Sequence, residues 1–228
     1  MKHTINIKGV IIPNDYKWYY DWFEMDSTCV KDVKDIMDQV KDGDEVEVYI
    51  NSPGGVIDVG SEIYTMLRQH AEKVKIYITG EACSAASVIA MAAYSEMAPT
   101  ALMMVHCVSS GVNGNHRDME HMAETLRTAD KALSSAYVDK TGMSEEEILQ
   151  IMENETWLTA DQALERGLID KVMFREEESK PFVAGPLFAL PSNEQMEKAK
   201  EMMKNTSGKD DILLQTKLNL MKLRKGEM

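Results

Sequence analysis

The sequence has few cysteines, few prolines and no long apolar run. Its 228 residues include 3 cysteines and 6 prolines. No stretch approaches the roughly 18 consecutive apolar residues that a membrane span needs, and MKHTINIKGV (1–10) lacks the apolar block of a signal peptide. Cys29, Cys83 and Cys107 form no CxxC pair and no metal-ligand spacing. We therefore expect a cytoplasmic protein with reduced, packed cysteines, no metal and no membrane partner.

Positive charge is scarce as well. The chain has 25 Lys and Arg against 38 Asp and Glu, a net charge of −13. Phosphate binding needs clustered Lys and Arg, so we expect no nucleic-acid partner. The imbalance is uneven, because residues 192–228 carry +2 and residues 1–191 carry −15. The phosphate-binding pattern GxxxxGK[ST] is absent, so we expect no ATPase activity of the chain's own and no cofactor.

Strands and helices alternate along the body of the chain. β-Branched residues predict strands over 5–12, 45–51, 74–79 and 101–106, and apolar residues at helical spacing predict helices over 29–40, 56–70, 84–93 and 116–140. Two capping boxes, Ser144 with Glu147 and Thr159 with Gln162, predict two further helices. Strands separated by helices favour right-handed crossovers and a largely parallel sheet, so the predicted fold class is α/β.

A change of composition near residue 180 predicts the domain organisation. We expect one domain over residues 1–179 and a linker over 180–193, which holds three of the six prolines. Residues 194–228 contain two short helical stretches and form a C-terminal helical appendage. The long helix 116–140 carries an apolar stripe of Met119, Met122, Leu126, Ala129, Leu133 and Ala136. That stripe packs either against another subunit or on its own domain.

Three stretches carry candidate chemistry. In SPGG (52–55) the paired glycines leave backbone N–H groups free to face a ligand, although a plain turn explains them too. Ser84 opens the helix of GEACSAASVIAMAA (80–93), where it is either a nucleophile or a helix cap, and Ser87 one turn later suits packing. His106 ends an apolar strand, as a general base or a satisfied core histidine. A serine at a helix start, a histidine at a strand end and a carboxylate later in the chain are together the residues that acyl transfer uses.

Four motifs in a fixed order carry a resemblance over residues 5–172. They are YINSPGG, GEACSAAS, MMVHCV and ETWLTADQALERGLID. In this the chain resembles the ClpP-type serine peptidases, and in particular the ClpP-related head-maturation (prohead) proteases of tailed bacteriophages. The resemblance implies a crotonase/ClpP-like αβ superhelix with a protruding long helix. It also implies a homo-oligomeric ring, commonly two stacked heptamers.

The resemblance assigns roles to five residues. Ser84 falls on the family's nucleophile and His106 on its general base. Gly55 and Ala85 fall on the two residues whose backbone N–H groups form the oxyanion hole. Glu155 stands where ClpP has the aspartate of the triad.

The function implied is that of a serine endopeptidase. Its substrates would be polypeptides, such as capsid or scaffolding protein in prohead maturation, in the host cytoplasm or the procapsid. Glu153 and Asp161 compete with Glu155 for the acid role, and an unfoldase ATPase partner is left open. The tail is a scaffold-contacting segment, a self-cleaved one or a solvated linker. Two other functions remain: an inactive ring-forming structural subunit, and a crotonase-fold acyl-CoA enzyme, which shares the paired-amide oxyanion hole but needs no serine nucleophile.

Overall fold

The structure, a computed structural model, describes residues 1–175 and 193–204. The chain divides into two compact units, Met1–Arg175 and Glu176–Met228. Every candidate site residue lies in the first unit. In the second unit the described element is α8 (Asn193–Lys204), which agrees with the first helix predicted for the appendage. The predicted linker up to residue 192 and the last predicted helical stretch lie outside the described residues.

The first unit is built on a mixed sheet that is mostly parallel. Its strands are β1 (Lys2–Ile11), β2 (Ser27–Thr28), β3 (Glu45–Gly55), β4 (Val74–Cys83), β5 (Tyr94–Met97), β6 (Leu102–Val105), β7 (Thr156–Thr159) and β8 (Lys171–Val172). The order is β2-β1-β3-β4-β5-β8, and β6 branches from β4 and pairs with β7. Every pairing is parallel except β6 with β7. The predicted α/β class with a largely parallel sheet is confirmed.

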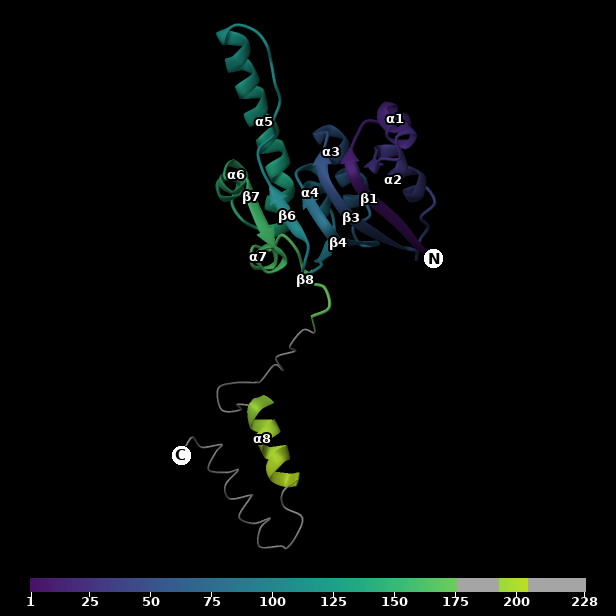
Figure 1. The fold of residues 1–228 in the computed structure, drawn as a ribbon, viewed down its shortest axis with the longest axis vertical. Helices are drawn as coiled ribbons and strands as arrows, with labels where there is room; N and C mark the ends of the chain where they lie inside the picture. The colour runs from purple at the N-terminus through teal and green to yellow at the C-terminus, as the bar shows by residue number, and fades with distance from the viewer. Residues whose placement is uncertain (176–192, 205–228) are drawn as a thin grey trace, which may run out of the picture. The chain divides into compact units, whose positions relative to one another are not determined.

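The helices of this unit occupy the connections between strands, as Figure 1 shows. They are α1 (Lys17–Trp22), α2 (Val30–Met37), α3 (Ile57–Arg68), α4 (Ala85–Ala90), α5 (His116–Thr141), α6 (Glu145–Glu153) and α7 (Ala160–Glu165), with a 3₁₀ turn at Asn14–Tyr16. Both predicted capping boxes are present, at Ser144 with Glu147 and at Thr159 with Gln162. The first turns of α5 project away from the sheet (Figure 1), and Met119 on these turns is 45% exposed, so the described residues leave this part of the apolar stripe uncovered.

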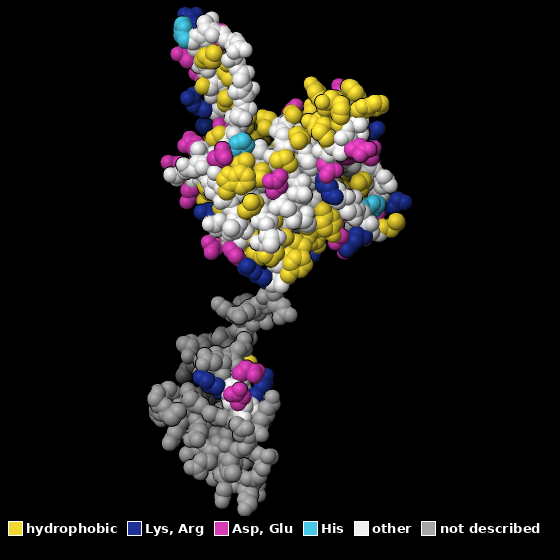
Figure 2. All heavy atoms as spheres, viewed as in Figure 1, with side chains coloured by type: hydrophobic (Ala, Val, Ile, Leu, Met, Phe, Trp, Pro, Cys, Tyr) yellow, Lys and Arg dark blue, Asp and Glu magenta, His cyan; other side chains and the backbone are white. Residues whose placement is uncertain are grey.

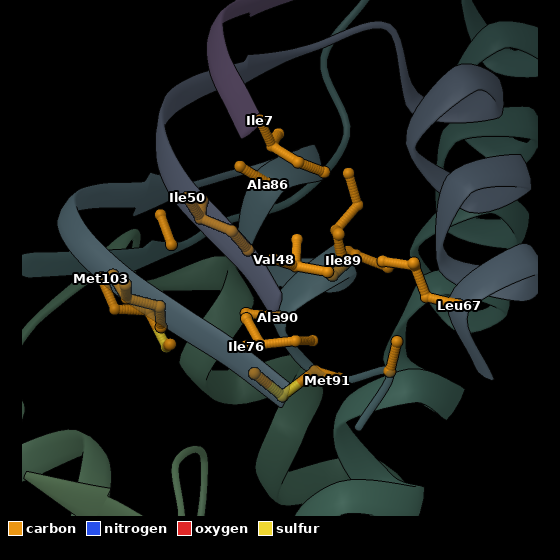
Figure 3. Close-up of a cluster of buried hydrophobic side chains, with 14 of the residues drawn as sticks. Ile7, Val48, Ile50, Leu67, Ile76, Ala86, Ile89, Ala90, Met91 and Met103 are labelled. Carbon is orange, nitrogen blue, oxygen red and sulfur yellow. The ribbon is translucent and has the colours of Figure 1, made fainter. Parts of the chain in front are cut away.

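The core lies between one face of the sheet and the short helix α4. Every second residue of the central strands is fully buried, among them Ile7 of β1, Val48 and Ile50 of β3 and Ile76 of β4. Figure 3 shows these side chains together with those of α4, including Ile89. Parallel strands covered on both faces read as continuous apolar runs, whereas these strands alternate apolar with polar residues. The described residues therefore cover only one face of the central strands.

Two predicted strand ends differ from the structure. β3 continues through SPGG to Gly55, and β4 continues past Gly80 to Cys83. The Ser52 hydroxyl holds the first extension in place, because it donates to the Gly9 carbonyl at 2.6 Å and accepts from the Gly54 N–H at 3.1 Å. SPGG is thus an irregular strand end rather than a loop. The predicted helix 84–93 is also shorter, since α4 spans only Ala85–Ala90.

The segment from Asn14 to Met25 forms helical structure that the sequence pattern does not predict. Its aromatic side chains are strongly exposed, including Trp18 at 70% and Trp22 at 79%. Figure 2 shows hydrophobic side chains gathered over α1. A helix whose apolar residues face solvent has no amphipathic stripe toward its own core, so helical periodicity gives no signal here.

Candidate active site

Ser84 occupies a strained turn between β4 and α4. Its backbone has φ 55° and ψ −126°, a conformation that side chains other than glycine rarely adopt. The Ser84 N–H donates to the Met104 carbonyl of β6 at 2.9 Å, which fixes the turn against the neighbouring strand. Such strain persists only where the surrounding structure holds it.

Ser84 and His106 form a hydrogen-bonded pair. The Ser84 Oγ lies 2.8 Å from His106 Nε2, and His106 follows directly on β6. Ser84 is the N-cap residue of α4, yet its side chain makes no capping hydrogen bond. The capping explanation for this serine therefore does not hold, and its hydroxyl is directed at a base instead. Because β4 and β6 are parallel neighbours, their adjacent ends bring together two residues 22 positions apart.

The strand end at SPGG packs closely against this turn. Gly54 has φ 95°, and a Cβ built there would lie 2.6 Å from the Cys83 carbonyl oxygen. Gly55 has φ 152°, and a Cβ there would lie 2.1 Å from the Ile11 carbonyl oxygen. Both positions therefore require glycine, one for its approach to the Ser84 turn and one for its approach to β1.

The two predicted oxyanion-hole residues lie beside the pair. Gly55, Ala85, Ser84 and His106 all line one small cavity of about 60 Å³. Ala85 is the first residue of α4, so its N–H has no acceptor within the helix. The structure thus brings both residues to the cavity of the Ser84 hydroxyl, and their role as donors stays a prediction.

Ser87 is a core residue, as predicted. It is fully buried, and its hydroxyl lies 2.6 Å from the Ser84 carbonyl oxygen and 2.8 Å from the Tyr137 hydroxyl of α5. Burial raises the pKa of the Tyr137 phenol, so it stays protonated and acts as a hydrogen-bonding group. This contact ties α4 to α5 beneath the site.

Among the described residues, no hydrogen bond joins Glu155 to the His106 ring. Glu155 is exposed, has φ 45°, and its Oε1 accepts a long hydrogen bond of 3.4 Å from Trp157 Nε1. Within residues 1–175 and 193–204, the His106 ring hydrogen-bonds only to the Ser84 hydroxyl. Asp161 pairs with Arg175, and Glu153 is exposed. The assignment of the acid among these three carboxylates stays a prediction.

The family model described as Clp protease matches residues 27–176, which is well over half of the sequence and includes Ser84, His106 and Glu155. The chain belongs to the Clp protease family. Membership of this family supports a ClpP-like serine peptidase, and the parallel sheet with its flanking helices agrees with that fold. Clp proteases act on polypeptides and form oligomeric rings.

The small cavity lined by Ser84 and His106 adjoins a larger groove. This groove has a volume of about 760 Å³ and shares Gly55, Ile57, Val108 and Ser109 with the cavity of the serine. Tyr16 and Tyr20 line one side, Met122, Leu126 and Ala129 of α5 line the other, and no lining residue carries a charge. The surface next to the Ser84 hydroxyl is therefore suited to apolar side chains.

Two of the three cysteines, Cys83 and Cys107, are sequence neighbours of Ser84 and His106. All three cysteines are free, as predicted, with Cys29 and Cys83 buried and Cys107 partly buried. Burial, with a smaller effect of Glu81, raises the pKa of Cys83 to about 12. Burial and the neighbouring Asp130 carboxylate raise the pKa of Cys107 to about 11. Both thiols flank the pair in sequence but stay protonated near neutral pH, so neither is a competing nucleophile.

The described part of the chain contains neither a cluster of metal-binding side chains nor a helix that could span a membrane. No three His, Cys, Asp or Glu side chains in residues 1–175 and 193–204 gather closely enough to hold a metal ion. Over these same residues, no helix has both the length and the apolar character that crossing a bilayer requires.

Sequence reasoning missed one buried charged residue of this region. Asp130 on α5 is 8% exposed, and its Oδ1 accepts a hydrogen bond of 2.6 Å from the Val108 N–H, two residues after His106. Its spacing of four from Leu126 and three from Leu133 places it on the inner face of the helix. That spacing is a signal, but a charged residue within a helix is ordinarily read as solvated.

Proposed function

We propose that the chain is a serine endopeptidase that cleaves polypeptides through an acyl-enzyme intermediate. The observation that carries the proposal is the contact of 2.8 Å between Ser84 Oγ and His106 Nε2, made by a serine in a strained turn. An imidazole at this distance takes the hydroxyl proton as a general base while the oxygen attacks. An acyl-CoA enzyme of this fold needs no such pair.

The residues at the site suggest the following steps. Ser84 Oγ forms a bond to the scissile carbonyl carbon, and its proton passes to His106 Nε2. The carbonyl oxygen becomes an oxyanion that accepts hydrogen bonds from the Gly55 and Ala85 N–H groups. The C–N bond breaks as His106 returns the proton to the leaving amine. Water then attacks the acyl-enzyme and gives a proton to His106. The bond between the acyl carbon and Ser84 Oγ breaks as His106 returns this proton to Oγ, which releases the new carboxyl terminus and restores Ser84.

For the acid of the triad we retain Glu155, on its aligned position in the family. A carboxylate on the far ring nitrogen fixes the tautomer of the base and stabilises the imidazolium. In the structure Glu155 Oε1 accepts from Trp157 and no hydrogen bond joins Glu155 to His106, so the proposed triad is complete only when this carboxylate also meets the His106 ring.

We also propose that the chain assembles into a ring and matures phage capsids by cleaving capsid or scaffolding protein. The proposal of a ring rests on the family and on the uncovered part of α5, where Met119 is 45% exposed.

The proposal of a capsid substrate rests on the resemblance to prohead proteases. A portal gene upstream and a major capsid gene downstream are expected, and co-expression with the capsid and scaffolding genes should yield shortened products. A gene far from any capsid cluster would contradict this role.

The peptidase activity is tested by exchange of the two serines. We expect Ser84→Ala to lower peptide turnover by about four orders of magnitude and to abolish labelling by a serine-reactive fluorophosphonate. Ser87→Ala is the matched control, because this buried hydroxyl cannot meet a substrate. Equal losses in both folded variants, or a wild-type chain that takes no label, would refute the proposal in favour of an inactive ring subunit or acyl-CoA chemistry.

A further inference from the structure

A buried carboxylate stands behind the catalytic pair and takes no part in the proposed chemistry. Asp130 is 8% exposed and, within residues 1–175 and 193–204, has no cationic partner within ion-pair distance. A buried carboxylate without a counter-ion costs free energy unless hydrogen bonds satisfy it. Its position near the site therefore calls for a role.

The donor to this carboxylate lies in the stretch that follows His106. The Val108 N–H donates to Asp130 Oδ1 at 2.6 Å. Burial and, to a smaller extent, the neighbouring Asp130 carboxylate raise the pKa of the Cys107 thiol to about 11, so this thiol stays protonated beside the carboxylate. The backbone two residues after the base is thus bound by one side chain of α5.

This stretch has few other constraints. Residues 106–113 have no regular secondary structure. The Cys107 N–H donates to the Met152 carbonyl at the end of α6, at 3.2 Å. With the bond to Asp130, this gives the backbone after His106 two anchors, one on α6 and one on α5. The shorter of the two is the one to Asp130.

We propose that Asp130 is a positioning residue for His106. Its oxygen holds the backbone N–H of Val108, which keeps the imidazole of His106 within reach of the Ser84 hydroxyl. The role requires a hydrogen-bond acceptor at Oδ1 and does not require a negative charge. The inference rests on the proposed peptidase function.

The test compares substitutions that keep or remove the acceptor, in the full chain. Asp130→Asn keeps a carbonyl oxygen, whereas Asp130→Ala and Asp130→Leu remove it, leaving a cavity or filling it. We expect Asp130→Ala and Asp130→Leu to lower kcat by about 10- to 100-fold with KM changed by less than about threefold, because misplacing a catalytic group slows the chemistry more than binding. Asp130→Asn should keep at least about a third of wild-type kcat.

Asp139→Ala is the matched control, since Asp139 is an exposed carboxylate on the same helix and should leave kcat unchanged. Wild-type kcat in Asp130→Ala or Asp130→Leu would overturn the role. So would an Asp130→Asn variant as slow as these two, since the charge would then be the contribution. If neither acceptor-free variant folds while Asp130→Asn does, the residue serves the fold rather than the base.

The proposed function has a separate readout in the same experiment. Fluorophosphonate labelling of the wild type that is lost in Ser84→Ala supports the peptidase whatever Asp130 does. Absence of Ser84-dependent labelling would overturn the peptidase, and the role of Asp130 with it.

Discussion

A side-chain atom at Gly54 would stand 2.7 Å from the Cβ of Ser84. No pair of real side-chain carbons tolerates that separation, so the strand end at SPGG and the Ser84 turn fit together only because position 54 has no Cβ. The strand thereby approaches Ser84 with its backbone alone.

Gly54→Ala should therefore damage both stability and turnover. A left-handed residue with a backbone clash costs about 1 to 3 kcal/mol of unfolding free energy, and displacement of the Ser84 turn should lower kcat by about 100-fold. Urea unfolding and peptide turnover measure the two effects. Gly111→Ala, where a Cβ meets nothing within 4 Å, should change neither. A Gly54→Ala enzyme with normal kcat would show that the close packing is not needed for catalysis.

Substitution of the three candidate acids assigns the triad carboxylate. We expect Glu155→Gln to lower kcat by about three to four orders of magnitude and Glu155→Asp to retain substantial activity. Glu153→Gln and Asp161→Asn should behave as wild type, because Glu153 is exposed and Asp161 pairs with Arg175. Inactivity confined to one of these two would move the role to it. Normal turnover in all the amide variants would leave a Ser84–His106 dyad.

The uncovered part of α5 makes a prediction about assembly. Light scattering should give a mass many times 25.7 kDa for the wild type, and Met119→Glu together with Met122→Glu should lower it, because charges desolvated in an interface are costly. Thr128→Glu, an exposed position on the same helix, is the control. An active monomer of wild-type sequence would argue against the ring.

The buried thiols predict a loss of stability in alkaline solution. The pKa of Cys83 is raised from 9.0 to about 12, so the unfolded chain releases this proton at lower pH than the folded chain. The contribution is fully present below pH 9 and is lost as the pH rises toward 12. Urea unfolding at pH 7.5, 9 and 10.5 should show a decline that is smaller in Cys83→Ala. An identical decline in both proteins would assign the effect to other groups.

The sequence predicts much of the central fold because its strands and helices are separated by clear changes of period. The alternation of apolar and polar residues in β1, β3 and β4 can be recognised within each segment of sequence. The order of the motifs then leads to Ser84 and His106. The last two strands at one end of the sheet cannot be predicted in this way. β5 and β8 are held by contacts between distant segments, such as the Ser95 N–H donating to Asp170 Oδ2 at 2.7 Å and the Lys140 ammonium pairing with the same carboxylate.

Two features of the site also exceed what local patterns indicate. The role proposed for Asp130 depends on its hydrogen bond with the Val108 N–H. The two residues meet only because α5 packs on the rest of the first unit. The geometry of Glu155 depends on its own left-handed backbone and on Trp157, neither of which motif alignment specifies. In both cases the decisive contact is made by tertiary structure, while propensity and periodicity describe neighbours along the chain.

The left-handed turn at Ser84 also bears on how such a chain would diverge. A serine in this conformation costs the fold about 1 to 3 kcal/mol, and a glycine adopts the same φ and ψ without that strain. The single replacement Ser84→Gly would relieve this strain and remove the hydroxyl that meets His106. Backbone strain therefore favours glycine at this position, and a need for the hydroxyl itself favours serine.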